Sequence, residues 1–164
     1  MSDEVTEFGF SYEYGMDIKS GSTWLPFRFP TGIGVPVTPT MAASQTYDDL
    51  GSANDTKISE SWTASLTVQQ HRLADGKYLP EVEALKALTE PGVNGQAAVG
   101  TFRWYDKPAE GSANPDDAYE GDATVQFERG ETGADGIGSW NVTLTGKGRR
   151  RKIANPWEGW TVTP

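Results

Sequence analysis

Apolar and polar residues alternate along several stretches of this sequence, and a period of two predicts strands that bury one face. The clearest stretch is 61–68, in which Trp62, Ala64, Leu66 and Val68 alternate with serine and threonine. Further stretches with this pattern are residues 10–18, 100–104, 123–128 and 139–144. We therefore predict at least five strands, with Trp62, Trp104 and Trp140 in the core.

One helix is predicted between these strands, within LPEVEALKALTEPG at residues 79–92. Pro80 suits a first helical position, two glutamates follow it near the positive end of the helix dipole, and Pro91-Gly92 ends the helix. Val82, Leu85 and Leu88 form one apolar stripe, so the helix should lie on a sheet. The turn-rich segment 131–138 predicts a hairpin between the last two strands.

Two stretches do not fit a compact domain. Residues 24–60 are rich in proline, glycine, serine and acidic residues, and we expect a long loop with one short extended piece at 35–38. Residues 153–164 form a C-terminal arm with Trp157 and Trp160 among asparagine, glycine and proline. A loop of this length is either functional or disordered, and the arm has too little apolar material to fold alone.

Length and composition indicate a single domain over residues 1–164 with a real core. The chain has no cysteine, which excludes disulfides and suits a reducing cytoplasm. We expect no signal peptide, since the first residues are acidic, and no membrane span, since proline and glycine break the longest uncharged run. A net charge of −9 argues against a protein that grips nucleic acid.

No catalytic or cofactor-binding pattern emerges, so we predict that the protein is not an enzyme and needs no cofactor. His71 is the only histidine and follows a strand, without a serine elbow or metal-ligand partners. The paired carboxylates lie in glycine- and serine-rich loops, as solvated acids do. NPDDAYEGD offers oxygen ligands for calcium but lacks the EF-hand spacing, so a calcium site is a minor alternative.

The remaining features favour self-assembly. Residues 110–135 carry eight acids against Arg129 alone, whereas Lys147 and the run Arg149, Arg150, Arg151 and Lys152 give five positive charges within six residues. Such opposite clusters could orient one copy against the next, although two solvated loops are an equally good interpretation. Arms that become ordered on association and exposed strand edges would supply further contacts.

Taken together, the sequence resembles the major tail tube proteins of long-tailed, non-contractile bacteriophages. The resemblance rests on SQTYDDLGSANDTK followed by ISESWTASLTVQQH, on LPEVEALKAL placed before GTFRWYD, on GSWNVTLTGKG and on the ending GWTVTP. It covers most of the chain from Tyr12 onward.

The resemblance implies a mainly β fold, a β-sandwich or rolled antiparallel sheets flanked by one α-helix. It further implies hexameric rings, made in the host cytoplasm, that stack into the virion tail and conduct DNA without binding it specifically. The tape measure, tail terminator and distal tail proteins would be its partners. Carried onto this sequence, the subunit interface would contain Tyr47, Asp48, Asp49, Asn54, Asp55 and Lys57 in a ring-to-ring loop, Arg149, Arg150 and Arg151 facing an acidic loop of a neighbour, and Trp157 and Trp160 in an arm docked on the next copy.

Two alternatives stay open from the sequence. A carbohydrate-binding β-sandwich could use Trp24, Trp104, Trp157 and Trp160 as a sugar-stacking platform. A tail terminator or head-tail connector would share the virion role and form single rings.

Overall fold

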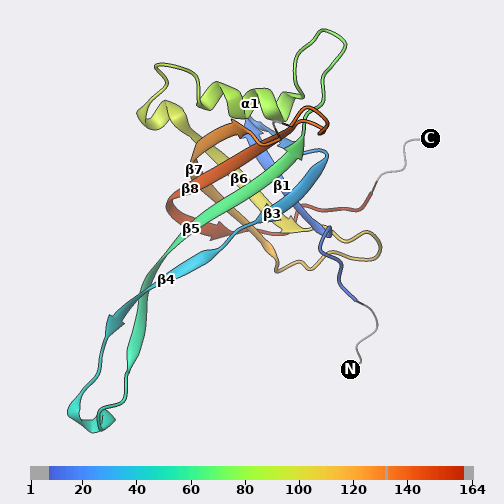
Figure 1. The fold of residues 1–164 in the computed structure, drawn as a ribbon. Coiled ribbons are helices and arrows are strands. Elements are labelled where there is room, and N and C mark those ends of the chain that lie inside the picture. Colours follow the sequence, from blue (N-terminus) through green and yellow to red (C-terminus); the bar gives the residue numbers. More distant parts are fainter. Residues whose placement is uncertain (1–7, 132, 161–164) are drawn as a thin grey trace.

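The computed structural model describes residues 8–131 and 133–160, and within them strands dominate (Figure 1). The elements in chain order are β1 (Tyr14–Ser20), β2 (Thr23–Pro26), β3 (Pro30–Gly34), β4 (Val37–Ala43), the 3-10 turn η1 (Tyr47–Asp49), β5 (Asp55–Gln69), α1 (Pro80–Leu88), the 3-10 turn η2 (Gly95–Ala98), β6 (Val99–Asp106), β7 (Ala118–Arg129) and β8 (Ser139–Lys152). The prediction of a mainly β fold with one α-helix is confirmed.

The strands form a rolled antiparallel sheet in the order β2-β1-β6-β7-β8-β5-β3, with β4 paired to the outer half of β5. Residues 27–29 connect β2 and β3, the two edge strands of this sheet, and bond to the strands next to them. Phe27 N–H donates to the Met16 carbonyl of β1 at 3.0 Å, and Gln69 N–H of β5 donates to the Phe29 carbonyl at 3.1 Å. The segment thus bridges β1 and β5 and closes the roll.

The inside of the roll holds the core that the alternation predicts. Trp62, Trp104 and Trp140 are buried, as expected. They pack with a larger apolar set that includes Met16, Ile18, Phe27, Ala64, Leu66, Val68, Phe102, Val142 and Leu144. The predicted strand at 10–18 is shorter than its pattern, however, because β1 begins at Tyr14, while Phe10 and Tyr12 stack on each other outside the sheet.

Helix α1 lies across one end of the rolled sheet (Figure 1). Its residues Val82 and Leu85 are buried in the core, which confirms the predicted apolar face. Glu81 in its first turn is also buried and accepts hydrogen bonds from the Arg28 guanidinium at 3.0 and 3.2 Å. This pair ties the bridging segment to the helix.

Two glycines make room for Trp62 at the point where β5 leaves the body. A Cβ on Gly121 would lie 2.6 Å from the Trp62 ring, and one on Gly146 would lie 2.6 Å from its ring nitrogen and backbone carbonyl. Neither contact is sterically possible, so β7 and β8 approach the indole only because both positions lack a side chain.

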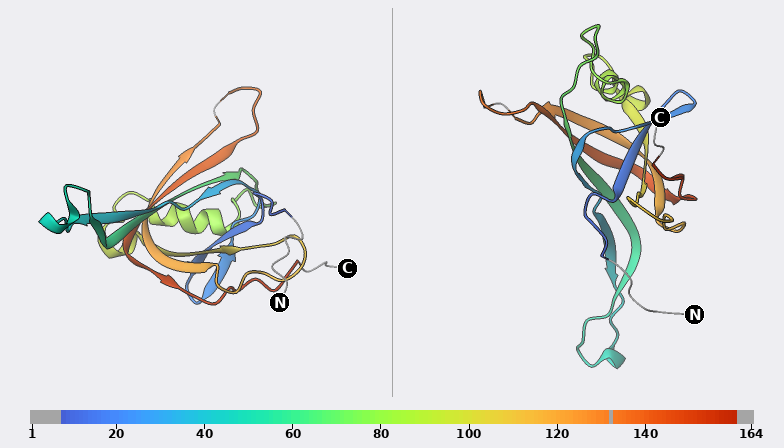
Figure 2. Two further views of the ribbon diagram at one scale, coloured as in Figure 1. Left: turned by 90° about the horizontal axis from the view of Figure 1, so that it is seen from below. Right: turned by 90° about the vertical axis from the view of Figure 1, so that its right-hand side faces the viewer.

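The expectation that residues 24–60 form one long loop is wrong. β2, β3, β4 and the start of β5 lie in this region, and β4 and β5 form a hairpin that extends well beyond the body (Figures 1 and 2). The sequence pattern does not reveal this hairpin, because most of its side chains are exposed on both faces. Its strands therefore show no alternation of apolar and polar residues. The predicted β7–β8 hairpin is confirmed, with Arg129 opposite Trp140.

Candidate interaction surfaces

The tip of the β4–β5 hairpin, residues 44–54, is a structured turn that internal hydrogen bonds stabilise. Asp49 accepts hydrogen bonds from the Thr46 backbone N–H at 2.7 Å and from the Asn54 side-chain amide at 3.3 Å. These bonds stabilise the ionised form and hold the pKa of Asp49 below its ordinary value. Asn54 also accepts from the Ser44 backbone N–H at 2.8 Å across the neck of the tip. Of the predicted interface residues, Asp49 and Asn54 therefore shape the tip.

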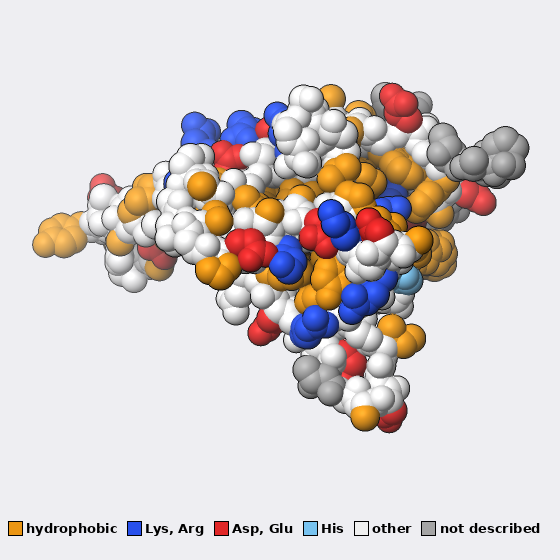
Figure 3. Space-filling model, turned by 90° about the horizontal axis from the view of Figure 1, so that it is seen from above, with side chains coloured by type: hydrophobic (Ala, Val, Ile, Leu, Met, Phe, Trp, Pro, Cys, Tyr) orange, Lys and Arg blue, Asp and Glu red, His pale blue; other side chains and the backbone are white. Residues whose placement is uncertain are grey.

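The hairpin presents apolar side chains to solvent. Tyr47 is 100% exposed and Leu50 is 91% exposed, and Met41 and Ile58 lie uncovered farther down its two strands. Hydrophobic side chains gather at the far end of the hairpin in Figure 3. Leu50 also has a positive φ of 51°, a conformation that costs a residue with a Cβ about 1–2 kcal/mol. A tip that only reversed the chain would be more stable with a polar residue or glycine at this position.

An ionic cluster holds the base of the hairpin to the body. Glu60 accepts from Lys57 Nζ at 3.0 Å and from Arg150 Nε at 2.9 Å, and both cations hold its pKa below the ordinary value. Arg150 also lies over the Tyr119 ring, 4.6 Å from its centroid. Two predicted interface residues, Lys57 and Arg150, thus meet on one glutamate of the same chain and set the direction in which the hairpin leaves.

Two residues of the basic run, Arg151 and Lys152, pair with acids of residues 110–135 within one subunit, while the contact of the run with an acidic loop of a neighbour stays a prediction. Arg151 contacts Glu120 at 3.0 Å and Asp122 at 3.5 Å, and Lys152 lies 3.8 Å from Asp116. The antiparallel pairing of β7 with β8 brings these residues together. Arg149 is exposed at the end of this run, and its place in an interface stays a prediction.

The described part of the C-terminal arm, residues 153–160, packs on the arm's own subunit. The Asn155 amide donates to the Asn114 carbonyl at 2.9 Å and to the Asp106 carbonyl at 3.0 Å. Trp157 and Trp160 meet edge to face, and the Lys107 ammonium lies 4.9 Å and 4.3 Å from their ring centroids. The docking of both Trp on a neighbour stays a prediction, and within one chain the two rings already contact each other and Lys107.

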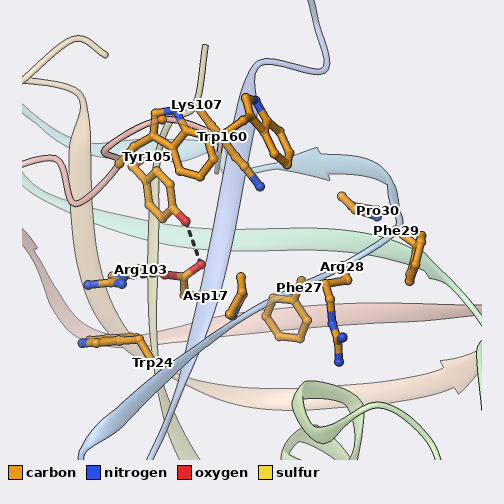
Figure 4. A pocket seen from close by; sticks show the side chains of 13 residues that line it. Asp17, Trp24, Phe27, Arg28, Phe29, Pro30, Arg103, Tyr105, Lys107 and Trp160 are labelled. Atoms are coloured by element: carbon orange, nitrogen blue, oxygen red, sulfur yellow. Dashed lines mark hydrogen bonds and ion pairs between the residues drawn. The ribbon is translucent and has the colours of Figure 1, made fainter. Parts of the chain in front are cut away.

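These Trp residues help to line an open pocket of about 670 Å³ on the outer face of β2, β1 and β6. We call it the aromatic pocket, and it is lined chiefly by Trp24, Arg103, Tyr105, Lys107, Trp157 and Trp160. In Figure 4, Tyr105, Arg103 and Asp17 lie between Trp160 at one end and Trp24 at the other.

The floor of the aromatic pocket is a buried polar network. Asp17 is 2% exposed and accepts from Arg103 Nε at 2.7 Å and from the Tyr105 hydroxyl at 2.8 Å. Burial, and then the negative charge of Asp17, raise the pKa of Tyr105 well above its ordinary value, so this phenol stays a donor. Arg103 also stacks on Trp24, 4.5 Å from its centroid. The floor is thus rigid and already paired.

Lys107 differs from the other two cations of the pocket. Arg28 and Arg103 are paired with Glu81 and Asp17, whereas no carboxylate of the described residues lies within ion-pair distance of Lys107. Its half-buried ammonium has a lowered pKa, chiefly because burial removes water from it. The aromatic pocket therefore holds one cation that an incoming carboxylate could stabilise.

Sequence reasoning found the hairpin tip and the arm but missed the pocket floor. Asp17 lies at a polar position of the alternating stretch 10–18, but Trp24 of β2 and the arm cover this face of the sheet. The side chains of Asp17 and Arg103 meet across 86 residues of sequence, and no local pattern signals this contact. Their register in the β1–β6 pair is the only signal, and it needs the structure.

The described residues contain no cluster of three or more histidine, aspartate and glutamate side chains that could hold a metal ion. No helix within 8–131 and 133–160 has the length and apolarity to cross a membrane. His71 stacks on Phe29 at a centroid distance of 4.0 Å beside the bridging segment. It is therefore a packing residue here.

No protein-family model matches the chain, and no curated protein matches it in sequence. Several solved structures do match the chain in fold. The chain is similar to the SPP1 tail tube, with a TM-score of 0.63 and 14% identity, covering 89% of this chain and 78% of the other. It is also similar to a chain of the native gene transfer agent virion (TM-score 0.65, 8% identity, 90% and 100% covered) and to a chain of the tail of an empty gene transfer agent particle with C6 symmetry (TM-score 0.62, 9% identity, 90% and 100% covered). The resemblance to tail tube proteins is thereby confirmed for the fold.

Proposed function

We propose that this chain is the structural subunit of a phage tail tube. Copies assemble into six-membered rings, the rings stack head to tail, and DNA passes through the channel during ejection. The observation that carries the proposal is a rolled sheet shared over 89% of the chain with the SPP1 tail tube, together with a long hairpin whose apolar tip is uncovered. The C6 symmetry of the similar gene transfer agent tail supports rings of six.

The position of the hairpin supports stacking. Its tip and the end of the described chain lie on opposite sides of the body in both Figure 1 and the left view of Figure 2. A subunit with unlike surfaces at opposite ends associates head to tail, and such contacts repeat into a ring or a filament. The acidic balance of −9 fits a channel on which DNA slides without sticking. A tape measure, a tail terminator and distal tail proteins would be its partners in the virion.

Electron microscopy of the purified protein at rising concentration tests this proposal. We expect tubes of uniform diameter with a stain-filled channel, and single rings at lower concentration. Rings that never stack would favour a tail terminator or connector instead. Monomers at all concentrations, even with a tape measure protein present, would contradict the proposal.

A carbohydrate-binding module remains the second candidate, because Trp24, Trp157 and Trp160 do meet at one pocket. Trp104, the fourth residue of the predicted platform, is 2% exposed and cannot stack on a sugar. Binding of a monomer to a glycan array, lost in Trp24→Ala, would support this function over the tube.

A further inference from the structure

We propose that the aromatic pocket is the receptor for the hairpin tip of another copy of this chain, with Lys107 pairing to Asp48. This inference rests on the proposed function and names the contact that would join successive copies. It rests on three properties of the described residues: the position of the two surfaces, their charge and their apolar side chains.

The positions exclude a contact between the two surfaces within one chain. The tip lies at the far end of a hairpin that points away from the body, while the pocket is lined by the C-terminal arm on the opposite side (Figures 1 and 2). The tip cannot reach the pocket of its own chain. Docking of the tip into the pocket of a second copy leaves that copy's own tip free, so the same contact can repeat from copy to copy.

The charges are complementary. Residues 44–54 contain Asp48 and Asp49 and no cation. Asp49 is engaged in shaping the tip, whereas Asp48 is exposed beside Tyr47. In the pocket, Lys107 is the cation whose pairing is incomplete within the described chain. A partly desolvated ammonium gains more from a carboxylate than a fully hydrated one does, because the lower local dielectric strengthens their attraction.

The apolar side chains of the two surfaces are complementary as well. The pocket offers indole faces at its two ends, and the tip offers one aromatic and one aliphatic side chain that are almost fully exposed. Aromatic anchors that enter a pocket of this kind dominate the energy of many interfaces. The positive φ of Leu50 ends the 3-10 turn η1, where the Leu50 N–H donates to the Tyr47 carbonyl at 3.1 Å, and the Leu50 side chain stays almost fully exposed.

A reciprocal charge swap tests the pairing. We expect Lys107→Glu and Asp48→Lys each to reduce tube formation, measured by sedimentation and microscopy, by about tenfold or more. The double variant restores the attraction with reversed sign, so its tube yield should return toward that of the wild type. Asp135→Lys makes the same charge change at the tip of the other hairpin and should leave assembly intact.

The outcomes separate the two proposals. If the wild type forms tubes but the single variants assemble equally well, or the double variant is no better than either, this pocket is not the receptor and the tube function stands. The same holds if Asp135→Lys is as damaging as Asp48→Lys. If the wild type forms no tubes, both proposals fail together.

A second measurement covers the case of a variant that does not fold. The chain has no cysteine, so single cysteines can be placed without interference. A protein with Tyr47→Cys, mixed with one carrying Trp160→Cys, should cross-link through a short bismaleimide into a dimer, while each protein alone gives none. Ile137→Cys mixed with Trp160→Cys is the matched control, because Ile137 is 74% exposed on the other hairpin. Equal cross-linking of both mixtures would overturn the proposed contact.

Discussion

The two halves of β5 belong to one strand but differ in almost every physical property. From Trp62 to Gln69 every second residue is buried, and the strand has neighbours on both sides, β8 and β3. From Asp55 to Ser61 most side chains are exposed, and β4 is the only neighbour. The inner half is stable because it contributes to the core of one chain, whereas the outer half has no core of its own.

A two-stranded hairpin without a packed face is at best marginally stable in water. This hairpin compensates with local devices: the capped tip around Asp49 and the ionic cluster of Glu60 at its base. Pro39 and a bulge at Thr40 and Met41 interrupt its free edge, which discourages unspecific strand pairing. We therefore expect stability and assembly to be separable in this fold, and the following predictions test that separation.

The largest expected effect lies at the boundary between the two halves. Trp62→Ala should lower the free energy of unfolding by about 3–5 kcal/mol, because the indole fills the space between two glycines and packs on Trp104. Tyr47→Ala, which removes a fully exposed aromatic ring, should change it by less than about 0.5 kcal/mol while reducing tube formation. Urea denaturation followed by Trp fluorescence measures the free energy of unfolding of both variants. A loss of stability of equal size in the two variants would contradict the separation.

A smaller effect is expected on the outer face of the sheet. Asp17→Asn removes the charge that pairs with Arg103 and should cost about 2 kcal/mol, since a hydrogen bond to a charged group in a buried site is lost. Asp122→Asn is the control, because Asp122 contacts Arg151 on a more exposed surface and should cost less than about 1 kcal/mol. Thermal unfolding at neutral pH compares the two. An equal decrease in the unfolding temperature of the two variants would mean that the aromatic pocket has no rigid floor.

The same division decides how much of the structure could be predicted from the sequence. Strands that bury one face show a period of two, so the region from Trp62 to Val68 and the partner strands β7 and β8 were predicted. The hairpin was not, since exposure on both faces leaves no period to detect. The tip was found through its resemblance to a tail tube loop, while the pocket floor depends on contacts between distant residues that only the register of β1 and β6 creates.

The smallest expected change in stability is also the sharpest test of the comparison. Ala43 and Asp55 are paired directly across the hairpin, so residues 44–54 can be replaced by Asn-Gly, which closes a two-residue turn. The shortened chain should keep its free energy of unfolding within about 0.5 kcal/mol, because no residue of the tip contributes to the core and the Asn-Gly turn closes the hairpin in place of the capped tip. It should nevertheless form no tubes. Replacing residues 131–138 in the other hairpin by Asn-Gly is the matched control and should preserve assembly. A shortened β4–β5 hairpin that still assembles would show that the outer half of β5 exists for some purpose other than joining copies.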